Sequence, residues 1–434
     1  MSPIPWSLLP DNAAVGPEGQ LLIGGVDTLE LAHEFGTPLF VYDEDHLRAR
    51  CAAAFEAFGP SATYASKAFL CRAMARLAAE EGLGIDVASG GELHVCLAAG
   101  VPPERLVFHG NNKSPNELRY ALDAGVGRIV IDSFDELDRL EALLSEAAAT
   151  APADEEQQRP KVLLRITPGI KAETHDYIAT GQDDSKFGFT VSTGVAAEAV
   201  ERAQASPWIE LVGLHAHIGS QVFRVDSFAA AVDVLARFAN PLDLDELVVG
   251  GGLGVAYVEG EEAATISQWS SIITKAAAEA GVTATLGVEP GRAIAAAAAV
   301  TLYTVGTVKD IPGIRTYVSV DGGMSDNPRP VLYGSGYETF LPRAVKADRE
   351  AEVRLVGKHC ESGDLLVREA KMPTDLAIGD IVATPVTGAY GHSMGSNYNK
   401  ILRPAVVFVR NGQARLVVRR ETYDDLLATD VDDG

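Results

Sequence analysis

The sequence of 434 residues contains only four cysteines, Cys51, Cys71, Cys96 and Cys360. No two of them form a C-x-x-C pair. A disulfide framework or a cysteine zinc site is therefore not expected. Unpaired thiols favour a reducing compartment, so we expect a cytoplasmic protein. The segment Met1 to Asn12 has no basic stretch followed by an apolar run, and no signal peptide is expected.

Long apolar runs and clusters of basic residues are also missing. The longest weakly polar stretch, residues 293–308, is rich in Ala and shorter than the ~20 apolar residues of a membrane span, so it predicts a buried segment. Lys and Arg number 36 against 60 Asp and Glu, which gives a formal net charge of −24. This excess repels phosphate backbones, so neither nucleic acid nor a membrane is expected as a partner.

Between residues 39 and 294, short apolar runs alternate with helical patterns. The eight runs are 62–66, 84–88, 105–109, 128–132, 161–166, 211–217, 246–250 and 285–289. One connecting helix has a clear start, because Ser114 precedes a proline and stands three residues before Glu117. Apolar strands that alternate with helices are typical of a parallel sheet, and eight such units predict a (β/α)8 barrel of the α/β class over residues 39–294.

Residues 295–434 have a different character, with short β-branched runs separated by turns. Asn411-Gly412 lies between two apolar runs, 406–410 and 414–419, and predicts a tight hairpin. We therefore predict a second, mostly antiparallel β domain over residues 295–434. Residues 1–38 are assigned to the same domain, because the isolated apolar run Leu21-Leu22-Ile23 suits an added strand.

Polar residues follow almost every run of the predicted barrel, at the end where parallel barrels carry their sites. Lys67 follows the first run, where partial desolvation would make it a Schiff-base nucleophile, or where it reaches solvent at the rim. Gly250-Gly251-Gly252 follows the seventh run and suits either an anion or a tight turn. Glu289 and Arg292 stand at the end of the eighth run. In one interpretation Glu289 binds a protonated ring nitrogen and Arg292 binds an anion; in the other, the two side chains pair with each other.

Two further patterns leave alternatives open. His215 and His217 lie on one face of the same strand, which suits a metal pair or an imidazole that stacks on a flat cofactor, although no third metal ligand has a typical spacing. Cys360 is either a proton donor beside carboxylates or an inert core residue. Together, a phosphate loop, a partner for a ring nitrogen, a stacking imidazole and a Schiff-base lysine describe a site for pyridoxal phosphate.

At the level of whole motifs, the chain resembles the diaminopimelate decarboxylases, which are alanine-racemase-like (fold type III) pyridoxal phosphate enzymes. The matching fragments are Y-A-S-K-A-F at 64–69, H-G-N-N-K-S at 109–114, S-K-F-G at 185–188, H-A-H-I-G-S-Q at 215–221, G-G-G-L-G at 250–254, E-P-G-R at 289–292, D-G-G-M-S-D-N-P-R-P-V-L-Y-G at 321–334, C-E-S-G-D at 360–364 and G-A-Y at 388–390. Their order and coverage identify the family, whose fold is a (β/α)8 barrel with a β domain.

The resemblance implies a role for each matching residue. Lys67 would hold the cofactor covalently and act as a catalytic residue together with Cys360. The cofactor-binding residues would be Lys67, Asp86, His217, Ser220, Gly250, Gly251, Gly252, Glu289, Pro290, Gly291, Arg292 and Tyr390. The substrate-binding residues would be Arg292, Arg329, Tyr333, Glu361 and Tyr390, and no metal is implied. As in related enzymes, the partner subunit of a homodimer would donate Cys360 and Glu361 to the site.

The implied reaction is the decarboxylation of meso-2,6-diaminoheptanedioate (meso-diaminopimelate) at its D-carbon to L-lysine and carbon dioxide, the last step of lysine biosynthesis. Two alternatives stay open. One is a sister activity on ornithine, lysine, arginine or carboxynorspermidine, against which Arg329 and Glu361 argue. The other is a non-catalytic homologue, against which the presence of Lys67, Glu289 and Cys360 argues.

Overall fold

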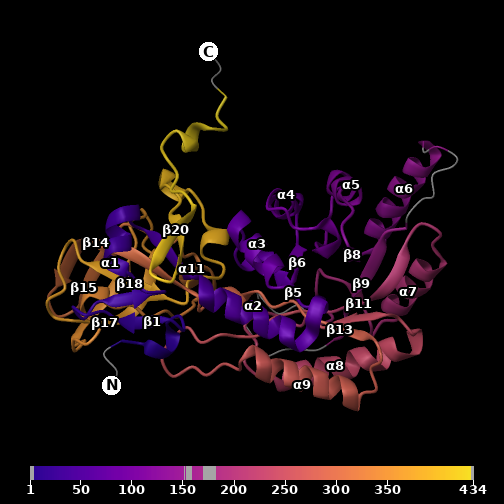
Figure 1. Ribbon diagram of the computed structural model, residues 1–434, viewed down its shortest axis with the longest axis horizontal. Coiled ribbons are helices and arrows are strands. Elements are labelled where there is room, and N and C mark those ends of the chain that lie inside the picture. Colours follow the sequence, from indigo (N-terminus) through magenta and orange to yellow (C-terminus); the bar gives the residue numbers. More distant parts are fainter. Residues whose placement is uncertain (1–3, 151, 153–158, 170–181, 432–434) are drawn as a thin grey trace. The chain divides into compact units, whose positions relative to one another are not determined.

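The computed structural model describes residues 4–150, 152, 159–169 and 182–431, and the chain divides into two compact units. The barrel unit comprises Arg50–Gly254 and Ala263–Ala293, and the β unit comprises Met1–Ala49, Val255–Glu262 and Ile294–Gly434 (Figure 1). Much of the polar stretch 150–160 lies outside the described residues.

Eight parallel strands form the wall of the barrel unit, as predicted. They are β5(Thr63–Ala65), β6(Gly84–Val87), β7(Leu106–Phe108), β8(Arg128–Ile131), β9(Lys161–Thr167), β11(Glu210–His215), β12(Glu246–Val248) and β13(Thr285–Gly287). A parallel bridge between Ala62 and Val288 joins the last strand to the first, and the Thr63 N–H donates to the Val288 carbonyl oxygen at 2.9 Å. The (β/α)8 barrel is therefore closed. A short extra strand, β10(Phe189–Thr190), pairs with β9.

Helices lie outside these strands (Figure 1). They are α3(Arg72–Glu80), α4(Gly90–Ala98), α5(Pro115–Ala124), α6(Phe134–Thr150), α7(Val195–Ala205), α8(Asp226–Ala239) and α9(Ile266–Glu279), while α2(Glu44–Phe58) spans the sequence boundary between the units. The predicted start of α5 is confirmed, since Ser114 and Glu117 form a complete capping box. Two of the four N–H groups that a helix start leaves without intrahelical partners are thereby satisfied.

The β unit contains a mixed sheet with the order β17-β16-β15-β14-β4-β19-β20, and β18 also pairs with β14. Its strands are β4(Leu39–Asp43), β14(Ala299–Ile311), β15(Arg315–Val320), β16(Ala351–Val356), β17(Leu365–Met372), β18(Ile381–Pro385), β19(Ala405–Arg410) and β20(Gln413–Val418). Most pairs are antiparallel, as predicted, and the exceptions are β4 with β19 and β15 with β16. The predicted hairpin connects β19 to β20 through Asn411 and Gly412, both with positive φ.

One segment differs from the prediction. Leu39–Asp43, placed at the start of the barrel, forms β4 between β14 and β19, because all five side chains are buried and both strand edges find partners there.

The run Leu21–Ile23 forms the predicted strand of the β unit. This strand, β2, pairs in a separate antiparallel sheet with β1(Ala13–Val15) and β3(Val26–Asp27), and α1(Thr28–Phe35) follows.

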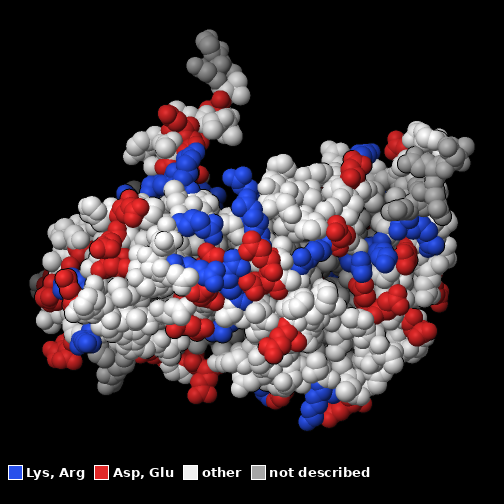
Figure 2. All heavy atoms as spheres, viewed as in Figure 1, with Lys and Arg blue, Asp and Glu red and all other residues white. Residues whose placement is uncertain are grey.

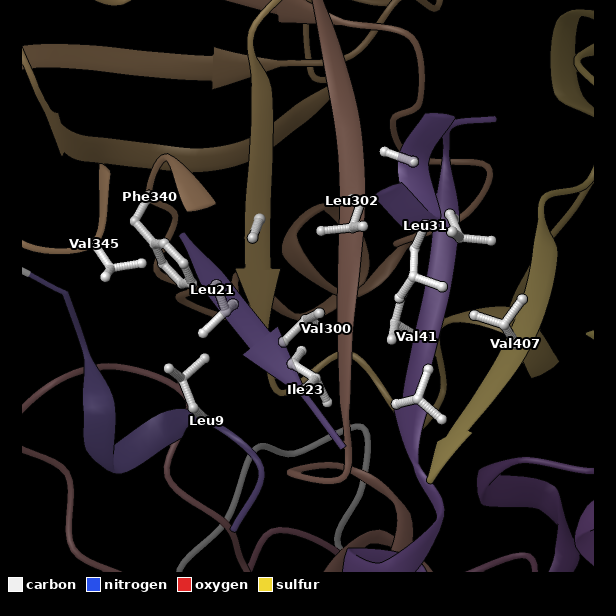
Figure 3. Close-up of a cluster of buried hydrophobic side chains, with 14 of the residues drawn as sticks. Leu9, Leu21, Ile23, Leu31, Val41, Val300, Leu302, Phe340, Val345 and Val407 are labelled. Carbon is white, nitrogen blue, oxygen red and sulfur yellow. The ribbon is translucent and has the colours of Figure 1, made fainter. Parts of the chain in front are cut away.

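A continuous apolar core joins these pieces of the β unit (Figure 3). Leu21 and Ile23 from β2 pack in one buried cluster with Val41 from β4 and with Val300 and Leu302 from β14. The N-terminal segment therefore belongs to this core mainly through side-chain packing. Its strands pair with one another in their own small sheet, and the Gly24 carbonyl oxygen accepts a hydrogen bond from the Gly412 N–H at 2.8 Å.

Charged side chains lie on the surface (Figure 2), and most of the apolar stretch 293–308 is buried, as predicted for that stretch. Lys and Arg side chains are interspersed with Asp and Glu over the face seen in Figure 2. The stretch includes most of α10(Arg292–Ala295) and residues 299–308 of β14. It is buried or half-buried up to Val305, whereas Gly306, Thr307 and Val308 are exposed, so the predicted burial fails for the last three residues. Among the described residues, no helix has the length and apolar character that crossing a membrane requires.

A buried ion pair between Lys113 and Glu136 connects the loop after β7 to α6. Lys113 is 2% exposed, and its Nζ donates to the carbonyl oxygens of Gly110 and Val130 at 2.9 and 2.6 Å. The same ammonium lies 2.5 Å from Oε1 of Glu136, whose other oxygen accepts from the Asp132 N–H at 3.2 Å. Each charge is thus compensated inside the fold.

We predict that Lys113→Ala destabilises the barrel unit by ~3–5 kcal/mol, because Glu136 is then buried without its cation. Urea denaturation followed by circular dichroism measures the effect. The control is Arg119→Ala, since Arg119 and Glu146 form an exposed pair 3.8 Å apart that is expected to contribute no more than ~1 kcal/mol. Equal losses in the two variants would contradict the proposed importance of the buried pair.

Candidate active site

The carboxyl ends of the barrel strands gather most of the predicted cofactor-binding residues at one rim. Lys67 lies in the short helix η3(Ser66–Ala68) after β5, Asp86 lies in β6, His217 and Ser220 follow β11, Gly250, Gly251 and Gly252 follow β12, and Glu289, Pro290, Gly291 and Arg292 follow β13. The desolvation suggested for Lys67 is not found, because its side chain is exposed. An exposed amine at the rim is accessible to a reacting carbonyl group.

Glu289 lies between two histidines. His215 places Nε2 3.0 Å from one carboxylate oxygen, and His109 places Nε2 3.2 Å from the other. The two imidazole rings pack edge to face with centroids 4.9 Å apart, and His109 also lies 3.6 Å from Asp86. The sequence marked His109 only as a polar residue after a strand, and its contact with Glu289 depends on barrel closure.

The charges of this cluster keep Glu289 ionised. Burial alone would raise the pKa of Glu289, but the neighbouring His215 and His109 outweigh burial and hold that pKa well below its usual range. Burial opposes protonation of His109, yet the charges of Glu289 and Asp86 raise its pKa to about 9. Burial lowers the pKa of His215 to about 4. The site therefore offers an anion that suits a protonated ring nitrogen.

His217 has a different environment from His215. Its Nδ1 accepts a hydrogen bond from the Gly251 N–H at 3.3 Å. Burial and the charge of Lys67 lower its pKa well below the usual range, so the ring is neutral. The two histidines suggested as a metal pair thus have separate partners. Ligand atoms of His109, His215 and Glu289 lie within 4.8 Å of one another, and the hydrogen bond between His215 and Glu289 together with the ion pair between His109 and Glu289 accounts for that spacing.

The glycines after β12 allow a close approach of backbones that no other residue would permit. Gly250 and Gly252 have positive φ angles of 73° and 104°. A Cβ on Gly250 would lie 2.5 Å from the Ala216 carbonyl oxygen, and one on Gly252 would overlap the Gly219 carbonyl oxygen. Without side chains, the N–H groups of this loop are accessible to an anion. The fit to a phosphate group is therefore good.

Arg292 adds a cation to the same end of the site. It is 7% exposed, and its Nη2 donates to the Ser220 hydroxyl at 2.9 Å. The preceding Gly291 lies against the first strand, because a Cβ there would be 3.0 Å from the Ala65 carbonyl oxygen. A guanidinium, a hydroxyl and the backbone of the glycine loop together form a donor set of the kind that a phosphate requires.

The remaining predicted residues belong to the β unit. Arg329 begins α11(Arg329–Tyr333) and is 4% exposed. Its guanidinium lies 3.9 Å from the ring centre of Tyr257 and donates to the Tyr337 hydroxyl at 2.7 Å. Within the described part of the chain, no carboxylate lies within 4 Å of this guanidinium, and its Nε has no hydrogen-bond partner. Tyr333 ends the same helix and is half-buried.

Cys360 and Glu361 are exposed, and Cys360 is therefore not an inert core residue. Glu361 accepts a hydrogen bond of 2.7 Å from the Tyr398 hydroxyl. Tyr390 has a φ of 60°, a strained conformation for an aromatic residue that often marks a functional position. The sequence missed Tyr257, Tyr337 and Tyr398, because no local pattern shows which distant charged residue a tyrosine contacts.

Residues 44–296 match the family model described as "Pyridoxal-dependent decarboxylase, pyridoxal binding domain". The diaminopimelate decarboxylases of Mycobacterium tuberculosis and Bacillus subtilis are 46% and 45% identical to this chain. The alignments cover 99% of this chain and 98% of the mycobacterial protein, and 95% of both chains for the Bacillus protein.

Solved structures agree with these sequences. Diaminopimelate decarboxylase from M. jannaschii in complex with L-lysine has a TM-score of 0.88 at 31% identity and covers 98% of both chains. The Helicobacter pylori enzyme with L-lysine has a TM-score of 0.83 at 31% identity, over 93% of this chain and 98% of that one. Fold, site and similarity define a barrel decarboxylase that depends on pyridoxal phosphate. Within that class, the chain belongs to the diaminopimelate decarboxylase family.

We predict that the cofactor-free protein loses stability as the pH rises from about 6.5 to about 9. The pKa of His109 is raised to about 9, against ~6.5 in an unfolded chain, so its contribution is complete below pH ~6.5 and is lost as the pH passes about 9. Urea midpoints across this range measure the effect, and His109→Gln should reduce the slope. His33→Gln, an exposed histidine of α1, is the matched control. An unchanged slope in His109→Gln would contradict the assigned charge state.

Proposed function

We propose that the protein decarboxylates meso-2,6-diaminoheptanedioate at its D-configured carbon and releases L-lysine and carbon dioxide, the last step of lysine biosynthesis. The names of the bacterial relatives, and the L-lysine in the related structures, support this reaction. The observation that carries the proposal for this chain is the buried guanidinium of Arg329.

The substrate loses one carboxylate and keeps the other, so its recognition requires a cation for the retained group. Arg329 is held by two tyrosines, and no carboxylate of the described residues lies within 4 Å of it. A buried cation without an anion is costly, and a substrate carboxylate would compensate it. Ornithine and lysine carry only the carboxylate that leaves, so a decarboxylase for them has no use for this charge.

The residues of the barrel rim fit pyridoxal phosphate. When bound, the cofactor supplies an electron sink for the pair of electrons that departing carbon dioxide leaves on carbon. Lys67 would hold the cofactor through its side-chain amine. Glu289 would keep a proton on the ring nitrogen, and the neutral His217 would contact the ring. Ser220, Arg292 and the N–H groups of 250–252 hold the phosphate.

The β unit provides the substrate-side groups in this proposal. Cys360 donates a proton to the carbon that lost its carboxylate, and Glu361 binds the distal ammonium. Tyr333 and Tyr390 complete the substrate contacts, and Asp86 supports the cofactor through the His109 cluster. Exposure of both Cys360 and Glu361 agrees with their donation to another subunit.

The proposed assembly is a homodimer with shared sites. In it, the barrel unit holds the cofactor, while the β unit completes the site of the partner subunit. The proposed location is the cytoplasm, where the four free cysteines stay reduced.

Carbon dioxide release by the purified protein with added pyridoxal phosphate tests the reaction. The panel contains meso-diaminopimelate, its LL isomer, ornithine, lysine and arginine. We expect release from the meso isomer alone, with L-lysine as the product. Release from a basic amino acid would keep the fold and the cofactor but refute the roles of Arg329 and Glu361.

Within this panel, Arg329→Ala should raise KM for the meso isomer steeply, because losing one partner of a buried charge pair costs ~2–5 kcal/mol. Arg237→Ala is the control, since Arg237 pairs with Asp233 on the exposed surface of α8. A KM for Arg329→Ala equal to that of the control would make Arg329 a structural residue.

Mixing two inactive variants tests the shared site. Lys67→Ala removes the attachment of the cofactor, and Cys360→Ala removes the proposed proton donor, so each variant alone should be inactive. Subunit exchange between them restores one complete site per mixed dimer, and part of the activity should return. No recovery, despite exchange shown by a mass-tagged subunit, would place Lys67 and Cys360 in the same subunit's site.

A further inference from the structure

A buried carboxylate anchors the loop that carries Cys360 and Glu361, which we call the Cys360 loop (residues 359–364). Asp364 is 3% exposed and accepts hydrogen bonds from the Met324 N–H at 2.7 Å, the His359 N–H at 2.9 Å and His359 Nδ1 at 2.8 Å. A Cβ on Gly323 would lie 2.6 Å from this carboxylate, so the neighbouring loop packs directly against it. The orientation of the His359 ring is therefore fixed.

His359 in turn supports Tyr398. The two rings are parallel within 1°, with centroids 5.7 Å apart. Tyr398 begins the short helix η9(Tyr398–Lys400), and the next residue, Asn399, accepts a hydrogen bond from the Cys360 N–H at 3.0 Å through its side-chain oxygen. The helix η9 thus contacts the Cys360 loop twice. Asn399 binds the Cys360 backbone, and the Tyr398 ring stacks on the His359 ring.

The phenol of Tyr398 reaches the carboxylate at the tip of the loop. Its hydroxyl donates to Oε1 of Glu361 at 2.7 Å, a charge-assisted hydrogen bond. The Glu361 carboxylate raises the pKa of Tyr398, so the phenol remains a donor at neutral pH. Glu361 is exposed, and among the described residues no Lys or Arg lies within 4 Å of its carboxylate. Tyr398 is thus the contact that restricts a carboxylate otherwise free to rotate.

We propose that Tyr398 is a specificity-positioning residue that holds the Glu361 carboxylate in the orientation that binds the distal ammonium group of the substrate, with His359 and Asp364 fixing its ring. The inference rests on the proposed function, in which Glu361 binds that ammonium. One carboxylate oxygen accepts from the phenol, which leaves the other oxygen for the ligand. A preoriented carboxylate binds an ammonium group without first losing rotational freedom. Tyr398 itself does not touch the reacting carbon in this scheme.

The test uses the holoenzyme with meso-diaminopimelate. Tyr398→Phe keeps the ring and its stacking on His359 but removes the hydroxyl. We expect KM to rise roughly tenfold, as for the loss of one hydrogen bond to a charged group, while kcat stays within about twofold. Tyr423→Phe is the matched control, because Tyr423 is 77% exposed. Equal thermal midpoints for both variants show that the fold is kept.

A double-mutant cycle separates this inference from the proposed function. Glu361→Gln should raise KM, and adding Tyr398→Phe to Glu361→Gln should then change KM little, because the phenol no longer has a carboxylate to position. If Glu361→Gln leaves KM unchanged, the proposed role of Glu361 fails. If Glu361→Gln raises KM and Tyr398→Phe alone does not, Glu361 binds substrate without help and the positioning role of Tyr398 is overturned. A fall in kcat alone for Tyr398→Phe would also overturn it.

Discussion

The barrel unit depends on keeping one buried carboxylate ionised. Glu289 is 8% exposed, and an isolated charge at that depth would be protonated rather than tolerated. The charge of His109 and a hydrogen bond with His215 compensate it, and the charges of Glu289 and Asp86 in turn keep His109 protonated. These residues come from β6, β7, β11 and β13, which only a closed barrel brings to one point. The charge state of the site therefore depends on closure of the barrel, which the bridge between Ala62 and Val288 provides.

A second group of residues at the rim has the opposite polarity. The glycine loop 250–252 packs its backbone closely against neighbouring carbonyl oxygens, and Arg292 adds a guanidinium beside the Ser220 hydroxyl. The first group thus favours a protonated nitrogen and the second favours a phosphate. A flat molecule with a basic ring nitrogen at one end and a phosphate at the other matches both, and pyridoxal phosphate is such a molecule. The neutral ring of His217 lies in the same rim and adds no competing charge.

The sequence predicts the local features well and the long-range pairings less well. The eight barrel strands and the start of α5 follow from apolar periodicity and from capping residues, which act over a few positions. The predicted barrel began at residue 39 and so included β4, whose buried apolar side chains do not by themselves specify which strands it pairs with. Likewise, the motif at 321–334 marks Arg329 as a candidate substrate-binding residue, whereas its contact with Tyr257 joins residues far apart in the chain. The charge of His109 depends on burial and on two neighbours, Glu289 and Asp86, that lie far from it in the sequence, so no local residue pattern contains it.

Two buried cations of this protein, Lys113 and Arg329, differ in the partners that surround them. Lys113 lies against Glu136 and donates to two carbonyl oxygens, so its charge is fully compensated and its role is structural. Arg329 is equally buried, but aromatic faces and a phenol hold it, and these fix its position without cancelling its charge. A carboxylate partner from the same chain would have cancelled the charge of Arg329. In the proposed function, the aromatic support holds the guanidinium in place before the ligand arrives and leaves its charge for the retained carboxylate of the substrate.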